Sequence, residues 1–205
     1  MNNKLYAITD SHLLPGDRLF DAVAAALKGG CKLVQYRDKS TDQARRQFEA
    51  KTLVGLCNQY QAQLIINDDV SLVKDVGAHG IHLGQDDISP VAARIILGNR
   101  AIIGVTCHDS LELARTAIKD SANYIAFGRF FSSNTKPDAL PAPISLISDA
   151  RKEFSNTPIV GIGGITLSNG KQLLDAGADI LAVCHSLFSA EDITAQARKF
   201  IELKN

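Results

Sequence analysis

The sequence has 205 residues, a length typical of one domain, which would bury roughly 70% of the surface of its unfolded chain. Lysine plus arginine and aspartate plus glutamate number 22 each, so the formal net charge of zero favours neither nucleic acid nor an anionic membrane as a partner. The cysteines form no CxxC pair, and no apolar run is long enough for a signal peptide or a membrane span. We therefore expect a soluble, cytoplasmic protein whose residues 1–205 form one domain.

Short apolar segments alternate with amphipathic segments along the whole chain, at the spacing of a strand, a turn and a helix. The predicted strands are Leu5 to Thr9, Leu33 to Arg37, Gln63 to Asn67, Gly80 to Leu83, Ile102 to Thr106, Tyr124 to Gly128, Ile159 to Ile162 and Ile180 to Cys184. The predicted helices are Leu19 to Lys28, Gln43 to Gln59, Val70 to Val76, Pro90 to Leu97, Leu111 to Lys119, Ile144 to Glu153, Ser168 to Ala176 and Ile193 to Leu203.

Eight such units could form an open doubly wound sheet or a closed barrel. In an open sheet, polar side chains gather at one switch point, whereas a barrel collects all of its strand ends around one mouth. Polar side chains follow nearly every predicted strand of this sequence. We therefore predict an α/β fold in the form of a single-domain (β/α)8 TIM barrel.

Two acids, Asp68 and Asp87, follow consecutive predicted strands. In a barrel they would be neighbours at the mouth, where two carboxylates could share one magnesium ion and leave positions for substrate oxygens. The alternative is that Asp69 and Asp87 only cap the helices that follow them.

Three polar side chains, Gln35, Arg37 and Lys39, alternate with other residues at the second predicted strand and would lie on one face of an extended chain. Two cations in a barrel mouth need an anionic partner, because buried charge without one is costly. A bound anion such as a diphosphate would supply it. An internal salt bridge from Arg37 to Asp10 or Asp68 is the alternative.

A glycine-rich turn at 161–165 follows the seventh predicted strand and leads into a helix that Thr166 or Ser168 could cap. This is the usual phosphate position in TIM barrels. The longest connection runs from Phe130 to about Pro143 and is either a lid that brings hydroxyls and Lys136 to a phosphate or an insertion without a function. His82 and His108 end strands and could equally be hydrogen-bonded rim residues or catalysts.

Six segments in this order resemble the thiamine phosphate synthase (thiamine-phosphate pyrophosphorylase) family over nearly the whole chain. They are residues 6–10, 35–39, 66–69, 82–87, 135–137 and 161–165. The resemblance implies a (β/α)8 barrel that joins hydroxymethylpyrimidine diphosphate to a thiazole phosphate with Mg2+ and releases diphosphate. It also implies small-molecule substrates, no nucleic acid or membrane partner, and a possible homodimer.

The resemblance assigns roles residue by residue. Asp68 and Asp87 match the magnesium ligands, and Gln35, Arg37, Lys39, Asn67 and Lys136 match the diphosphate-binding residues, of which Arg37, Lys39 and Lys136 would be catalytic. Thr106 stands where the family usually has a Ser beside the substrate, and Ser133, Asn134, Thr135 and Gly164 match the contacts to the thiazole phosphate.

The end of the eighth predicted strand departs from the family. Val183, Cys184 and His185 stand where many members have an aliphatic residue and then Ser, so a Ser hydroxyl contact is lost, and the backbone amides of Cys184 and His185 are left to bind phosphate. The expected mechanism is early loss of diphosphate, followed by attack of the thiazole nitrogen on a pyrimidine cation. The rivals are a thiazole tautomerase and a catalytically silent barrel that binds thiazole phosphate and regulates.

Overall fold

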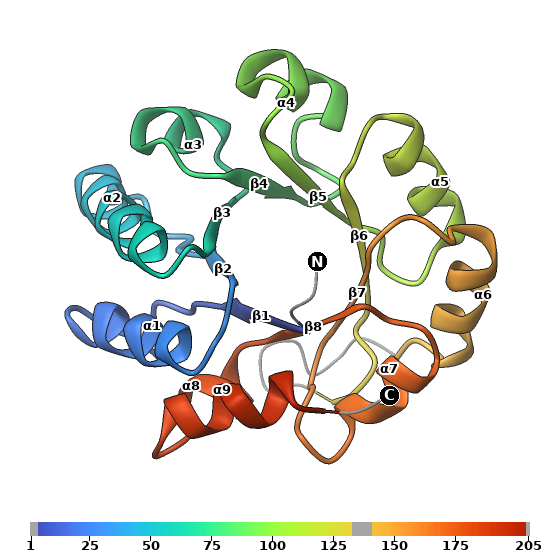
Figure 1. The fold of residues 1–205 in the computed structure, drawn as a ribbon. Helices are drawn as coiled ribbons and strands as arrows, with labels where there is room; N and C mark the ends of the chain where they lie inside the picture. The colour runs from blue at the N-terminus through green and yellow to red at the C-terminus, as the bar shows by residue number, and fades with distance from the viewer. Residues whose placement is uncertain (1–3, 133–140, 204–205) are drawn as a thin grey trace.

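The computed structural model describes residues 4–132 and 141–203, and its parallel strands close into one barrel (Figure 1). The strands pair in chain order, and β8 pairs with β1 to complete the ring. The predicted (β/α)8 fold is therefore confirmed. The strands are β1 (Leu5–Ile8), β2 (Leu33–Tyr36), β3 (Gln63–Asn67), β4 (Gly80–Leu83), β5 (Ile102–Thr106), β6 (Tyr124–Phe127), β7 (Ile159–Ile162) and β8 (Ile180–Val183).

The helices surround the ring of strands on its outer side (Figure 1). Within the described residues they are α1 (Arg18–Lys28), α2 (Gln43–Gln59), α3 (Val70–Val76), α4 (Pro90–Leu97), α5 (Leu111–Lys119), α6 (Ser145–Glu153), α7 (Gly170–Asp175), α8 (His185–Phe188) and α9 (Ile193–Ile201). None of these helices is both long and apolar enough to cross a membrane.

Side-chain caps set the starts of most of the longer helices. The residue before each of α2, α3, α4, α5 and α9 accepts a hydrogen bond from a backbone N–H in the first turn, which would otherwise have no partner. These caps are Asp42, Asp69, Ser89, Ser110 and Asp192. At the other end of α3, Gly77 adopts the left-handed conformation with φ of 72°.

The observed bounds agree closely with those predicted. Strands β3, β4, β5 and β7 and helices α2 to α5 begin and end as expected, and the other predicted elements shift by one or two residues. The short helix α8 was not predicted. The expected cap of α7 is also wrong: Thr166 and Ser168 bond to each other through their hydroxyls at 2.9 Å, and the helix begins only at Gly170.

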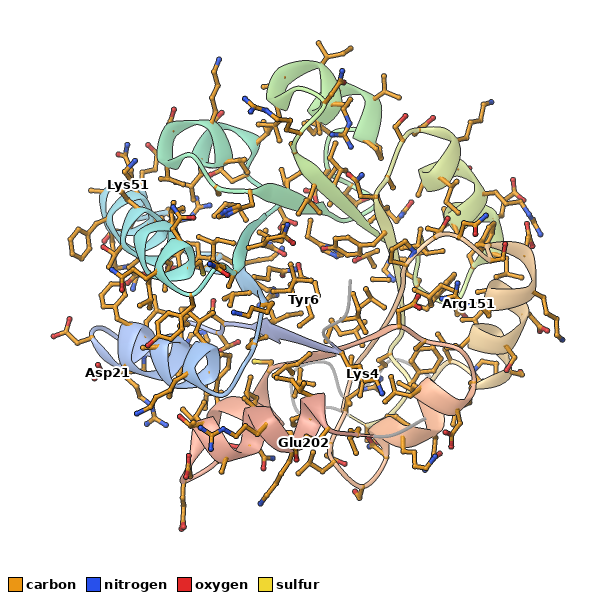
Figure 2. All side chains as sticks on the ribbon, in the orientation of Figure 1. Lys4, Tyr6, Asp21, Lys51, Arg151 and Glu202 are labelled. Atoms are coloured by element: carbon orange, nitrogen blue, oxygen red, sulfur yellow. The ribbon has the colours of Figure 1, made fainter. Side chains whose placement is uncertain are left out.

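Two apolar layers stabilise the barrel. One lies between the strands and the helices, and the other fills the interior of the ring with side chains that include Tyr6, Ile65, Tyr124 and Val160. Figure 2 shows Tyr6 inside the ring, whereas Asp21 and Lys51 lie on the outer helices. Gly104 makes room for this interior, because a Cβ atom there would lie 1.9 Å from Cζ of Tyr124.

Candidate active site

The carboxyl ends of the parallel strands share one end of the barrel, which we call the mouth. Asp68 follows β3, and its backbone N–H donates to the carbonyl of His82 on β4 at 2.9 Å. Asp87 lies in the connection after β4, where its Oδ2 accepts the N–H of Gly84 at 2.6 Å. The two carboxyl groups contact each other, so the structure brings together the two acids that the sequence pairs.

The pKa of Asp87 is raised, chiefly because burial disfavours its charged form. The Gly84 N–H and the charge of Lys39 lower this pKa, whereas the hydrogen bond and the charge of Asp68 raise it further. Two neighbouring carboxyl groups are a site to which a divalent cation can add, because the cation relieves the repulsion between their negative charges.

Capping explains Asp69 but not Asp87. Asp69 accepts the N–H of Leu72 at 2.9 Å in the first turn of α3 and forms an ion pair with Arg46 at 2.9 Å. The cap of α4 is instead Ser89, whose Oγ accepts the N–H of Ala92 at 3.2 Å. The alternative that Asp87 only caps a helix is therefore wrong.

One oxygen of Asp68 receives two donors. Nζ of Lys39 lies 3.0 Å from Oδ2 of Asp68, and Nδ2 of Asn67 donates to the same oxygen at 2.6 Å. The side chain of Lys39 is 62% exposed and that of Asp68 is 29% exposed. Asp68 also has φ of 63°, a left-handed conformation that aspartate and asparagine tolerate better than most residues.

Within the residues that the structure describes, Gln35 and Arg37 do not contact the acid pair as Lys39 does, and each has other surroundings. Strand β2 ends at Tyr36, and Gln35 is buried inside the barrel, where its Nε2 donates to Oη of Tyr6 at 2.8 Å. The backbone N–H of Arg37 donates to Oγ1 of Thr9 at 3.0 Å. Among the described residues the guanidinium of Arg37 forms no ion pair with Asp10 or Asp68, so the predicted alternative of an internal salt bridge is wrong.

Arg37 instead lies near the end of β8. Burial raises the pKa of the Cys184 thiol to about 12, the charge of Asp10 raises it further, and the charge of Arg37 lowers it. Cys184 precedes α8, and the exposed His185 begins this helix with its Nδ1 3.3 Å from Oγ of Ser189. Lys39 is therefore next to the acid pair, whereas Arg37 is near the end of β8.

The glycine turn after β7 packs against the start of the long connection. Gly163 and Gly164 have φ of 100° and 64°, and the N–H of Phe131 donates to the carbonyl of Gly163 at 3.1 Å. A Cβ atom on Gly164 would lie 2.3 Å from the carbonyl oxygen of Ser132, so only glycine fits. The predicted residues Ser133, Asn134, Thr135 and Lys136 lie outside the described residues.

Sequence reasoning assigned no role to two buried tyrosines and left the role of His82 undecided. Oη of Tyr6 lies 2.8 Å from Oη of Tyr124, which lies 2.9 Å from Nδ1 of His82. Nε2 of His82 is 2.8 Å from Oγ1 of Thr106, and the imidazole stacks on the Tyr124 ring. Burial lowers the pKa of His82 to about 4, although the charge of Asp68 raises it.

A signal in the sequence could have pointed to these residues: they are polar side chains in strands of a predicted barrel, where alternate side chains face the interior. Alternate side chains of a barrel strand point inward, and a polar group there needs a partner. Tyr6, His82 and Tyr124 all stand in predicted strands.

The fold and the strand-end residues define a TIM-barrel enzyme of a kind that acts on small molecules. Residues 5–187 match the family model described as thiamine monophosphate synthase. The chain belongs to this family.

Two relatives and one solved structure with closely related names were found in two further comparisons. The chain is 53% identical over 200 residues to a thiamine-phosphate synthase of Saccharophagus degradans, covering 97% of this chain and 92% of that protein. A thiamine-phosphate synthase of Nitrosococcus oceani is 52% identical over 196 residues, 96% of this chain and 90% of that protein. The solved structure of a thiamine phosphate pyrophosphorylase from Pyrococcus furiosus superposes with a TM-score of 0.88 at 30% identity, covering 98% and 95% of the two chains.

Proposed function

We propose that the protein is a thiamine-phosphate synthase. It joins hydroxymethylpyrimidine diphosphate to a thiazole phosphate, with or without a carboxyl group, and yields thiamine phosphate and diphosphate. The observation that carries this proposal is the contact between Asp68 and Asp87 with Lys39 beside them, at the mouth of a barrel of this family.

The acid pair suits Mg2+. Carboxylate oxygens are its preferred protein ligands, and it usually keeps several waters or phosphate oxygens, so two carboxylates are enough. The described part of the chain offers no cluster of three or more His, Cys, Asp or Glu side chains, the arrangement expected for a more fully ligated metal. When bound by Asp68 and Asp87, magnesium would neutralise charge on the diphosphate oxygens.

The positively charged side chains would stabilise the leaving diphosphate. We propose that Arg37, Lys39 and Lys136 stabilise the departing diphosphate as the catalytic residues, and that Gln35 and Asn67 help to position it. The electron pair of the CH2–O bond leaves with the diphosphate, and the aminopyrimidine delocalises the resulting cation. The lone pair of the thiazole nitrogen then forms the new C–N bond, so no side-chain nucleophile is needed.

The remaining predicted residues hold the two organic parts. Thr106 would contact the pyrimidine. The thiazole phosphate would bind at the glycine turn and at the end of β8, through Ser133, Asn134, Thr135, Gly164, Cys184 and His185. The place of the glycine turn directly after β7, which is the usual phosphate position in TIM barrels, supports this assignment.

Diphosphate release separates this function from its rivals. The purified protein is incubated with both substrates, with and without magnesium, and inorganic diphosphate is measured by a coupled assay. We expect diphosphate only when both substrates and magnesium are present. A thiazole tautomerase or a regulator that only binds thiazole phosphate would release none, and that result would refute the proposal.

We also propose that the protein is a cytoplasmic homodimer. The cysteines at 31, 57, 107 and 184 are free, which suits a reducing compartment.

Among the described residues, most of the exposed large apolar side chains lie on or next to α4, at Ile88, Val91, Ile95 and Ile96. A measured mass of one chain at micromolar concentration would contradict the dimer.

A further inference from the structure

A chain of hydrogen bonds crosses the interior of the barrel from Gln35 to Thr106. It runs from Nε2 of Gln35 to Oη of Tyr6 (2.8 Å), to Oη of Tyr124 (2.8 Å), to Nδ1 of His82 (2.9 Å), and from Nε2 of His82 to Oγ1 of Thr106 (2.8 Å). The five side chains come from β2, β1, β6, β4 and β5. We call this set of five residues the polar relay.

The number of protons fixes the direction of the relay. The Gln35 amide nitrogen only donates, so the oxygen of Tyr6 accepts and its single proton goes to Tyr124. The Tyr124 proton then goes to Nδ1 of His82, and the proton on Nε2 goes to Thr106. The reverse direction would leave the hydroxyl proton of Tyr6 without an acceptor at a residue that is 1% exposed, which is costly.

We propose that Tyr6, Tyr124 and His82 are positioning residues that hold His82 as the Nε2–H tautomer and leave the Thr106 hydroxyl proton free to bond an acceptor atom of the substrate. Thr106 can do this because it is only partly buried at the end of β5. In the reverse direction its proton would be used inside the relay, and the site would present only acceptor lone pairs.

The identity of the substrate atom that accepts the Thr106 proton rests on the proposed function. Gln85 precedes Asp87 in the connection after β4, and its Nε2 donates to the carbonyl of Thr106 at 2.5 Å. Thr106 is therefore in contact with the connection that carries Asp87, on the side of the mouth where the substrate that carries the diphosphate would bind. A pyrimidine ring has acceptor nitrogens, so the relay would select a heterocycle with an acceptor atom facing Thr106.

The tautomer can be measured without any activity. Long-range 1H–15N correlation spectra of the protein with 15N-labelled histidine distinguish Nε2–H from Nδ1–H imidazole, and His82→Gln assigns the signal. We expect Nε2–H in the unmodified protein and loss of this single tautomer in Tyr124→Phe. Tyr60→Phe, which removes a hydroxyl remote from the relay, should leave the spectrum unchanged. An Nδ1–H signal, or an unchanged signal in Tyr124→Phe, would overturn the proposal.

The kinetic test separates positioning from general structural damage. Loss of one neutral hydrogen bond in Thr106→Val should raise the KM for the pyrimidine diphosphate about tenfold, with the KM for the thiazole phosphate unchanged. Thr106→Ser restores the hydroxyl and should restore the KM. An unchanged KM in Thr106→Val, or equal changes for both substrates, would refute the role of Thr106. If the unmodified protein releases no diphosphate, the proposed function fails while the tautomer measurement still decides on the relay.

Discussion

Lys39 and Asp68 form an ion pair between the connections that follow β2 and β3, with Nζ 3.0 Å from Oδ2. The pair is largely exposed on the lysine side, and such pairs contribute only about 0 to 1 kcal/mol to stability. Lys39 can therefore leave Asp68 at little cost. In the proposed reaction it would move to the diphosphate while Asp68 binds magnesium.

Replacement of Lys39 should separate catalysis from stability. We expect Lys39→Ala to lower kcat/KM about 100-fold, because one cation on the departing diphosphate is lost, and to change the free energy of unfolding by less than ~0.5 kcal/mol. Steady-state kinetics and urea denaturation measure the two effects. Lys32→Ala is the matched control, since Lys32 bonds only the carbonyl of Tyr60 in the structure described here. Equal kinetic losses in both variants would contradict the assignment.

Asp68 is best tested with a variant that keeps its backbone conformation. Asparagine tolerates the φ of 63°, so Asp68→Asn should keep the thermal midpoint while magnesium-dependent turnover falls at least ~100-fold. Asp68→Ala should abolish turnover with the fold intact, at an extra cost of about 1 kcal/mol in stability from the left-handed conformation. The exposed Asp86 supplies the control variant Asp86→Asn. Full turnover in Asp68→Asn would exclude Asp68 as a metal ligand.

Asp87 should limit stability in the absence of magnesium. Because its pKa is raised, the folded state keeps the Asp87 proton to a higher pH than the unfolded chain, and stability falls as pH rises from the usual aspartate pKa through the raised value. Asp87→Asn should therefore raise the thermal midpoint at pH 7 by roughly 2 °C, and this gain should shrink as pH falls through that window.

The effect of magnesium on thermal stability tests whether Asp87 is a metal ligand. Thermal unfolding with and without the ion should show stabilisation of the unmodified protein and none of Asp87→Asn, which lacks one carboxylate ligand. A magnesium-dependent shift of equal size in both proteins would count against the metal site.

Gly164→Ala tests how closely the glycine turn packs. The added Cβ would lie 2.3 Å from the carbonyl oxygen of Ser132 and 2.7 Å from that of Phe131, so the connection after β6 must shift. We expect a loss of about 1 to 3 kcal/mol in stability and a raised KM for thiazole phosphate. Gly77 has a similar φ of 72°, but no atom lies within 4 Å of an added Cβ. Gly77→Ala should therefore lower the stability less than Gly164→Ala and leave the KM for thiazole phosphate unchanged.

The sequence predicts most of the barrel because local signals mark its elements. Asp42, Ser110 and Gly77 are residue types that are favoured at helix ends, so they mark ends of α2, α5 and α3. Helix α8 has four residues and no side-chain cap hydrogen bond at Cys184, so it carried no such signal.

Contacts between residues that follow neighbouring strands can be predicted from the order of the strands along the chain. Contacts across the interior of the barrel cannot, because they depend on how the ring closes. Asp68 and Asp87 end neighbouring units, and their contact follows from adjacent strands. Tyr6 and Tyr124 are 118 residues apart, on strands that are not neighbours, and their hydroxyls meet only across the interior of the closed ring. Their pairing depends on strand register and tilt, which periodicity alone does not give.

The close approach of the Tyr124 ring to Gly104 has an evolutionary consequence. A methyl group at this position and the Tyr124 ring cannot occupy the same space, since their atoms would lie 1.9 Å apart. A lineage that acquires alanine at 104 must therefore first or simultaneously give up the aromatic ring at 124. Among descendants of this barrel, the identities of these two positions should be inherited together.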